Sequence, residues 1–250
     1  MSLEEKQPLI SIITVTRNCE STIARTLDSV FEVKNNNIEY IIIDGISTDS
    51  TLKTINKYND IVDILVSEKD SGIYNAMNKG AELACGKYIL FLNGDDYILA
   101  DGFKRAMDVL REAAPEILSC QSEVYSQNGT KDSMLLPSLR RLFFFNSIPH
   151  LSTFVSADLQ KKYKFREIFK IAADYDLFLR MYRKGHHFML SELVTSVHYR
   201  GGFSNNLKLV TTEIKQIRKD NLGLTLYFIT RWIEWLNKLK NVVFTKKQGS

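Results

Sequence analysis

The 250-residue sequence predicts an α/β fold built on a mostly parallel, Rossmann-like sheet. Short β-branched runs alternate with single helical patterns over the first hundred residues, which is typical of consecutive βαβ units. Hydrophobic residues make up 44% of the chain and charged residues 25%, which is enough for a sizeable core and too apolar for a disordered protein. The longest stretch without Lys, Arg, Asp or Glu, residues 142–157, is too short to span a membrane.

The predicted elements alternate in chain order. The apolar runs and periodic patterns predict strands over residues 9–15, 39–44, 61–66 and 88–92, and helices over residues 23–31, 50–58 and 73–84. Farther on, the pattern predicts a helix over 103–113, a strand over 116–120 and a helix over 173–185. Right-handed crossovers place the carboxyl ends of parallel strands at one edge, so the residues that follow these strands should meet in one crevice.

Acidic residues follow three of the first four predicted strands. Asp44 follows the second strand, Asp70 the third, and Asp95 and Asp96 come directly after the fourth. An anionic crevice that binds an anionic ligand needs a divalent cation between them, and oxygen ligands favour Mg²⁺ or Mn²⁺. The alternative for Asp95 or Asp96 is to cap the next helix.

The sequence lacks the motifs of several common enzyme classes, which argues against a dinucleotide-binding enzyme, a P-loop protein and an α/β-hydrolase. There is no GxGxxG, no GxxxxGK[ST] and no GxSxG motif. Cys19, Cys85 and Cys120 are odd in number and widely spaced, so we expect neither a disulfide framework nor a zinc site. The N-terminus does not have the pattern of a secretory signal, and the net charge of +4 is too small to indicate nucleic-acid binding. We therefore expect a cytoplasmic protein with no nucleic-acid partner.

Five segments in register resemble one family. ISIITVTRN, IIIDGISTDST, SEKDSGIYNAMNKG, GKYILFLNGDD and ADYDLFLRM are similar to the motifs of family two inverting glycosyltransferases with the GT-A fold, of the bacterial polysaccharide-assembly type. The resemblance implies a nucleotide-sugar-binding half over residues 1–102. An acceptor-binding and catalytic half in the same compact body would follow over 103–206, and a basic amphipathic helical region over 207–250.

The resemblance also implies an activity. Members transfer a sugar from a nucleotide-diphosphate donor, usually a UDP-sugar, to a hydroxyl of a glycan or lipid-linked glycan. The transfer is a metal-assisted single displacement with inversion, in the assembly of cell-surface polysaccharide or lipopolysaccharide. The alternatives are a sugar nucleotidyltransferase and a non-catalytic module that binds nucleotide sugars or glycans.

The resemblance assigns roles residue by residue. The nucleotide-binding positions are Thr14, Val15, Thr16, Arg17, Asp44, Ser71, Gly72, Asn78, Lys79, Asn93 and Asp95. Asp96 is the first choice as ligand for Mg²⁺ or Mn²⁺, with Asp95 as the second. Gly45 stands where many relatives have a second acid that contacts the base.

Asp174 matches the general base of the family, and Asp176 is the fallback. The alternative for Asp174 is a helix N-cap. His150, His198 and Arg200 are further candidates for contacts with acceptor or phosphate, although each histidine has an ordinary structural role as its alternative.

The C-terminal region is basic and periodic. From Lys208 onward it contains nine basic and three acidic residues, a net charge of +6. Apolar residues recur at steps of three and four, which predicts an amphipathic helix, at Leu222, Leu226, Ile229, Ile233, Leu236, Leu239 and Val243. With Trp232 and Trp235 beside it, this helix is expected to contact the inner face of the cytoplasmic membrane through residues 222–244. The alternative is packing on the body or on a second subunit of a homo-oligomer.

Overall fold

A computed structural model describes residues 7–126, 128–200 and 206–247 of the chain, with side chains up to residue 233. Its strands are β1 (Ile10–Thr16), β2 (Ile38–Asp44), β3 (Ile64–Ser67), β4 (Tyr88–Asn93), β5 (Tyr97–Ile98), β6 (Ile117–Tyr125), β7 (Lys131–Leu135), β8 (Thr153–Ser156) and β9 (Phe188–Tyr199). Its α-helices are α1 (Ile23–Phe31), α2 (Thr51–Ile55), α3 (Ile73–Leu83), α4 (Ala100–Glu112), α5 (Ala157–Tyr163), α6 (Ala173–Arg183) and α7 (Leu207–Lys247). Short 3₁₀ helices are η1 (Asn56–Tyr58), η2 (Arg141–Phe143) and η3 (His150–Ser152).

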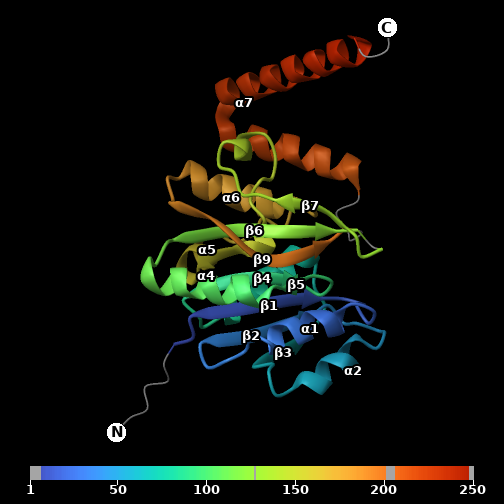
Figure 1. Ribbon diagram of the computed structural model, residues 1–250, viewed down its shortest axis with the longest axis vertical. Helices are drawn as coiled ribbons and strands as arrows, with labels where there is room; N and C mark the ends of the chain where they lie inside the picture. Colours follow the sequence, from blue (N-terminus) through green and yellow to red (C-terminus); the bar gives the residue numbers. More distant parts are fainter. Residues whose placement is uncertain (1–6, 127, 201–205, 248–250) are drawn as a thin grey trace.

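The strands form one sheet in the order β3-β2-β1-β4-β8-β6-β9-β5, and β7 pairs with β6 (Figure 1). The first four strands of this order are parallel. β8 is antiparallel to both β4 and β6, and β9 is parallel to β6. The predicted α/β sheet is therefore confirmed, with a parallel first half as expected and a mixed second half.

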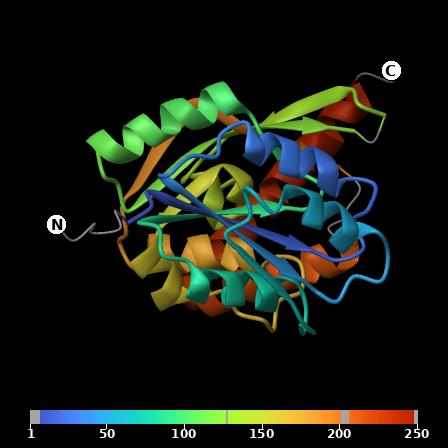
Figure 2. The same ribbon diagram turned by 90° about the horizontal axis from the view of Figure 1, so that it is seen from below.

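Helices cover both faces of the sheet (Figure 2). The alternation of side chains along β1 shows how: Ile10 and Ile12 pack in the cluster under α1, α2 and α4, whereas Ile13 and Val15 pack in the cluster under α3, α5 and α6. Because both faces are buried, the strand carries no charge and is rich in β-branched residues, which is why the sequence predicted a buried strand.

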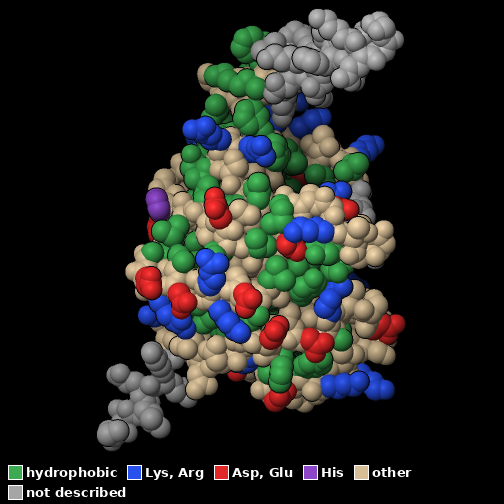
Figure 3. Space-filling model, viewed as in Figure 1, with side chains coloured by type: hydrophobic (Ala, Val, Ile, Leu, Met, Phe, Trp, Pro, Cys, Tyr) green, Lys and Arg blue, Asp and Glu red, His purple; other side chains and the backbone are tan. Residues whose placement is uncertain are grey.

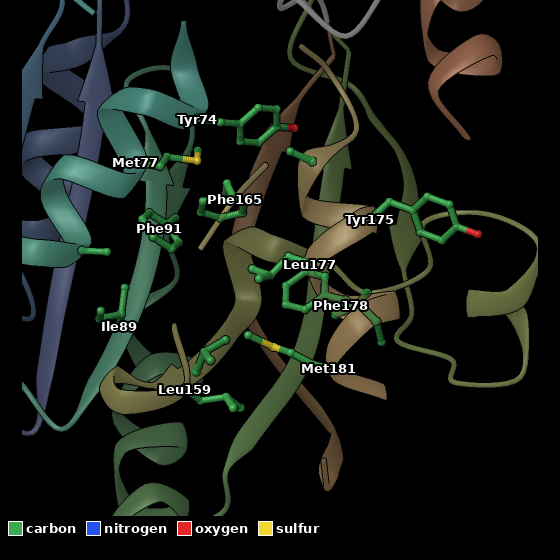
Figure 4. Close-up of a cluster of buried hydrophobic side chains, with 14 of the residues drawn as sticks. Tyr74, Met77, Ile89, Phe91, Leu159, Phe165, Tyr175, Leu177, Phe178 and Met181 are labelled. Atoms are coloured by element: carbon green, nitrogen blue, oxygen red, sulfur yellow. The ribbon is translucent and has the colours of Figure 1, made fainter. Parts of the chain in front are cut away.

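The hydrophobic core beneath α3, α5 and α6 joins the two halves of the chain (Figure 4). The ring of Phe165 lies 5.2 Å from that of Tyr74 in α3 and 5.1 Å from that of Phe91 in β4. Leu177 of α6 is buried in the same cluster. This packing brings the start of α6 to the carboxyl edge of the parallel strands.

The element boundaries depart from prediction where pairing with distant segments decides them. The strand predicted over 116–120 extends as β6 to Tyr125, because β7 and β9 pair along it. The helix predicted over 50–58 is divided into α2 and η1, and the helix predicted over 103–113 begins three residues earlier.

Helix α7 packs on the body and then leaves it. Leu222 is buried, and Leu226 and Tyr227 pack against the core, so the packing alternative is confirmed for this part of the predicted stripe. Between them Gly223 has φ 71° and ψ 161°, a conformation that only glycine adopts readily. Beyond this break the helix projects from the body (Figure 1). The side chains of Leu236, Leu239 and Val243 lie outside the description.

Within the described residues, none of the helices has the length and apolar character needed to cross a membrane.

Candidate active site

A cleft of about 940 Å³ lies at the carboxyl edge of the parallel strands. Residues 15–17, 70–77 and 93–95 line one wall, here called the N-terminal wall, and residues 134–136, 145–151 and Asp174 line the opposite wall. Of the predicted site residues, the cleft is lined by Val15, Thr16, Arg17, Ser71, Gly72, Asn93, Asp95, His150, Asp174 and His198. The lining does not include Thr14, Asp44, Asn78, Lys79, Asp96, Asp176 and Arg200.

The loop after β4 is held by one face of α1. The side chains of Thr22, Arg25 and Thr26 donate hydrogen bonds to the successive backbone carbonyls of residues 94–96, at 2.8, 2.9 and 2.7 Å. Sequence analysis missed these residues. Their spacing of three and four was the available signal, because it places all three on one side of a helix.

This loop turns its two carboxylates in different directions. Asp95 lines the cleft. Asp96 is fully buried, and its carboxylate accepts hydrogen bonds from His198 Nδ1 at 3.0 Å, Tyr199 N at 3.1 Å and Asn93 Nδ2 at 3.0 Å. The sequence placed Asp96 before Asp95 as the metal ligand. In the structure only Asp95 lines the cleft, and Asp96 is buried behind it.

Burial and neighbouring charges shift the pKa values of Asp95 and His198. Burial, and after it the charge of Asp96, raises the pKa of Asp95 to about 6. Burial opposes the charge on His198, but the hydrogen bond and charge of Asp96 outweigh it, so the pKa of His198 is raised. Among the side chains that the structure describes, no three His, Cys, Asp or Glu residues are grouped to hold a metal ion. A cation bound here would therefore need ligand oxygens from elsewhere, as Mg²⁺ commonly takes from substrate phosphates.

Asp174 lies on the opposite wall, in the first turn of α6, and is 8% exposed. Ala172 is the N-cap, so Asp174 is not the cap that the alternative interpretation expected. Its carboxylate accepts hydrogen bonds from Asn146 Nδ2 at 2.6 Å and Tyr74 Oη at 3.3 Å. Nδ1 of His150 lies 3.5 Å from Oδ2 of Asp174.

His150 also reaches the N-terminal wall. Its Nε2 lies 3.5 Å from Nδ2 of Asn93, at the end of β4. The imidazole therefore stands between Asn93 and Asp174, across the cleft.

The segment that leads into α6 is fixed by a carboxylate of α7. Glu213 is buried and accepts hydrogen bonds from the backbone N–H groups of Lys170, Ile171 and Ala172, at 2.7, 3.0 and 2.9 Å. Sequence analysis gave Glu213 no role, because only the tertiary fold brings α7 to this segment.

Asp176 lies away from the cleft. It is fully buried between Arg166 and Arg180, whose Nε atoms each donate to Oδ2 at 2.8 Å. Asn221 of α7 donates to Oδ1 at 3.0 Å. Both oxygens are thus used within the protein, and the structure gives the fallback base no access to a substrate in this cleft.

Two of the expected nucleotide contacts, Asp44 and Thr14, do not line the cleft. Asp44 is fully buried and accepts hydrogen bonds from Ser47 N at 2.9 Å and Ser67 Oγ at 2.6 Å. Thr14 accepts a hydrogen bond from Tyr40 Oη at 3.0 Å. The bonds of Asp44 join the end of β2 to Ser47 and to the end of β3, and the bond of Thr14 joins β1 to β2.

The remaining expected residues have protein partners. Nδ2 and Oδ1 of Asn78 bond the backbone of Phe165, each at 2.9 Å. Lys79 pairs with Glu68 at 2.7 Å, and Arg200 lies 3.6 Å from Asp132.

Asp70 occupies the space above Gly45. A β-carbon at position 45 would lie 2.4 Å from Oδ2 of Asp70, so a larger residue there would displace this carboxylate. Asp70 lines the cleft, and its Oδ1 accepts a hydrogen bond from Gly72 N at 2.9 Å. The sequence indicated Asp70 only as one of the acids that follow a strand.

Comparison with known proteins identifies the family of the chain. Residues 11–187 match the family described as Glycosyl transferase family 2. The chain belongs to this family. As a family 2 glycosyltransferase it is a transferase, which decides against the nucleotidyltransferase and the non-catalytic module.

Individual relatives of this family 2 glycosyltransferase cover different parts of it. It is 28% identical over 241 residues to the PGL/p-HBAD biosynthesis glycosyltransferase of Mycobacterium tuberculosis, covering 90% of this chain and 91% of that one. It is 41% identical over 90 residues to the UDP-Glc:alpha-D-GlcNAc-diphosphoundecaprenol beta-1,3-glucosyltransferase WfaP of Escherichia coli, which is 36% of each chain.

Among solved structures, residues 1–349 of S. aureus TarS in complex with UDP-GlcNAc superpose with a TM-score of 0.68 at 20% identity. The alignment covers 83% of this chain and 64% of that one. This likeness confirms the GT-A type of fold.

Proposed function

We propose that this glycosyltransferase moves a sugar from a nucleotide-diphosphate donor to a hydroxyl of a cell-surface glycan, with metal assistance and inversion. The observation that carries the proposal is a single cleft with Asp95 on one wall and Asp174 on the other. In this scheme residues 1–102 bind the donor, and residues 103–206 bind the acceptor and supply the base.

The donor occupies the wall formed by Val15, Thr16, Arg17 and the loop at residues 70–72. UDP-GlcNAc bound to TarS, a protein of the same fold, supports a UDP-sugar. We assign to Asp70 the acidic contact with the nucleotide that Gly45 lacks, because its carboxylate fills the space of a side chain at position 45. In this scheme Asp44 does not contact the nucleotide. It holds Ser47 and Ser67 by hydrogen bonds instead.

The oxygen ligands at this site fit Mg²⁺ or Mn²⁺. Asp95 is a half-buried carboxylate that lines the cleft, and its burial, followed by the charge of Asp96, raises its pKa. Asp95, together with the diphosphate oxygens of the donor, would hold the ion, and His198 lies beside them. The ion supplies positive charge that stabilises the departing nucleoside diphosphate.

Asp174 removes the proton from the acceptor hydroxyl as that oxygen attacks the anomeric carbon. Asn146 and Tyr74 orient the carboxylate, and His150 lies between it and the N-terminal wall. Asp176 is committed to Arg166 and Arg180, so it does not offer the second nearby carboxylate of a retaining reaction. This arrangement favours a single displacement, in which the anomeric configuration inverts.

The acceptor wall fits an amphiphilic molecule. Met134, Leu136, Phe145 and Val210 contribute apolar side chains to the cleft beside Asp174. The name of WfaP describes an acceptor that carries a diphosphoundecaprenol group. We therefore propose a glycan, in its lipid-linked form, as the acceptor, and a reaction at the cytoplasmic side of the membrane.

The test is a panel of UDP-, GDP- and dTDP-sugars with Mn²⁺ and a GlcNAc-diphospholipid acceptor. We expect release of nucleoside diphosphate from one class of donor that depends on both acceptor and metal. NMR of the product reads its anomeric configuration. Retention, or release that chelation of metal leaves unchanged, would contradict the proposed mechanism.

A further inference from the structure

The projecting part of α7 carries an apolar face that the body does not cover. Leu224, Phe228 and Trp232 are 69%, 64% and 61% exposed, and Ile229 beside them is 47% exposed. The first three recur at steps of four, so they lie on one side of the helix. We call these four residues the outer face of α7.

The opposite side of the same segment makes the contacts with the body. Leu226 and Tyr227 pack against the core, and Thr230 is buried and accepts a hydrogen bond from Arg218. The residues of the outer face are not among those that pack against the core. Figure 3 shows hydrophobic side chains gathered where this part of α7 leaves the body, with Lys and Arg side chains just beneath them.

The charge around the outer face identifies its partner. From Lys208 to the C-terminus the sequence has nine basic residues against three acidic ones, and Lys215 and Lys219 are exposed on the first half of α7. Two copies of so basic a segment repel each other, which disfavours a homodimer through this face. An exposed apolar stripe that contains Trp, next to an excess of Lys and Arg, matches the surface of an anionic bilayer.

We propose that the outer face of α7 binds the surface of an anionic lipid bilayer. Leu224, Phe228, Ile229 and Trp232 enter the boundary between headgroups and acyl chains, and the basic residues contact the anionic headgroups. Val210 and Ile214 of the same helix line the cleft, so this contact keeps the cleft close to the membrane. The inference does not depend on the identity of the donor sugar.

The first test uses Trp232 as a reporter. The chain has two tryptophans, so Trp235→Phe leaves Trp232 as the only one. With vesicles of phosphatidylcholine and 30% phosphatidylglycerol, we expect its emission to shift to the blue and to be quenched by brominated acyl chains. An unchanged spectrum, or an equal shift with pure phosphatidylcholine, would overturn the proposal.

The second test removes the outer face without touching the packed side. The Leu224→Ser/Phe228→Ser variant should lose at least about tenfold in its partition onto the same vesicles in co-sedimentation. Binding of the unaltered chain should weaken steeply between 50 and 500 mM salt. The matched control is Phe31→Ser/Ile168→Ser, which removes two similarly exposed apolar residues elsewhere.

Equal losses in both variants, or none in either, would defeat the assignment of this face. Analytical ultracentrifugation measures the oligomeric state of the chain and completes the test. A dimer of the unaltered chain that Leu224→Ser/Phe228→Ser converts to a monomer would show that a second copy covers the face, and the proposal would be wrong.

Discussion

Asp95 and Asp96 are adjacent in sequence but experience different surroundings. Asp96 is satisfied by an imidazole, an amide and a backbone N–H, whereas Asp95 lines the cleft and has a pKa raised to about 6. The sequence predicts that two acids follow β4, but it does not determine which one faces the ligand. That choice depends on the backbone direction set by α1 and on contacts with β9, more than 100 residues away.

We predict that Asp95→Asn removes the metal-dependent part of nucleotide binding. The variant keeps the shape of the side chain but cannot supply the negative charge, so the affinity for UDP in the presence of Mn²⁺ should fall about tenfold or more. Calorimetric titration with and without Mn²⁺ measures the difference. Asp101→Asn, an exposed acid in the first turn of α4, is the control. If Asp96→Asn loses the dependence on Mn²⁺ and Asp95→Asn retains it, the roles are reversed.

A second prediction concerns the base. Asp174→Asn can still accept the hydrogen bond from Asn146, but it cannot take a proton from the acceptor. Transfer should therefore fall by about 10²-fold or more, with nearly unchanged affinity for the donor. Asp158→Asn, in the first turn of α5, is the matched control. Near-normal transfer by Asp174→Asn would assign the base elsewhere.

Single residues also show where sequence reasoning ends. The motifs that resemble the family contain Asp95 and Asp174, and both residues line the cleft. The surroundings of Asp176 could not be predicted, because its partners Arg166 and Asn221 come from a loop and a distant helix. Similarly, only the folded chain brings Asp70 over Gly45.

Among the elements, α1 positions the site although none of its residues is catalytic. Thr26 is fully buried and its hydroxyl bonds the carbonyl of Asp96. We predict that Thr26→Val, which has the same shape, lowers the free energy of unfolding by about 1–3 kcal/mol, because a buried carbonyl loses its donor. The affinity for UDP with Mn²⁺ should fall as well, since the loop of Asp95 loses one restraint.

Chemical denaturation and calorimetry measure the two effects of Thr26→Val. Thr26→Ser keeps the hydroxyl and is the control. Equal nucleotide affinity in the valine and serine variants would show that the hydrogen bond supports the fold without positioning the loop.

The first half of α7 positions the opposite wall. Glu213→Gln presents an amide N–H₂ group to the N–H donors of residues 170–172, so one or more of these bonds should be lost. We expect kcat to fall several-fold with little change in the KM for the donor, because the affected segment carries Asp174 and not the N-terminal wall. Steady-state kinetics in which the concentrations of both substrates are varied measure kcat and the KM for the donor separately.

Glu192→Gln, at an exposed position of β9, is the control for this variant. If Glu213→Gln changed only the KM for the donor, Glu213 would act on donor binding and would not position Asp174.

For the molecule as a whole, the alternation of strands and helices was predictable because both faces of the parallel strands are covered, and burial on both faces leaves a continuous apolar pattern. The second half was less predictable. β6 pairs with β8, β9 and β7, and such long-range pairing follows from the tertiary fold and not from any local signal. The described side chains of α7 are packed on one side, as the packing alternative expected, and exposed on the other.

Truncation after Asp220 should therefore destabilise the protein. It removes the buried Leu222, the packed Leu226 and Tyr227, and the hydrogen bond from Asn221 to Asp176. We expect a loss of about 2–4 kcal/mol in the free energy of unfolding and a decrease of about 5–15 °C in Tm. Calorimetry compares it with truncation after Ile233, which retains all of these contacts and should melt close to the full chain. Equal Tm values would show that the packing of α7 contributes little.

The break at Gly223 has a mechanical consequence. A side chain at this position disfavours φ 71°, so Gly223→Ala would bias the backbone toward a continuous, straight helix. The 24 residues from Leu224 to Lys247 form an arm of about 36 Å at 1.5 Å per residue. A rotation of two dihedral angles at its pivot would swing the far end by tens of ångströms. One hydrogen atom in place of a methyl group thus sets the direction in which this arm points.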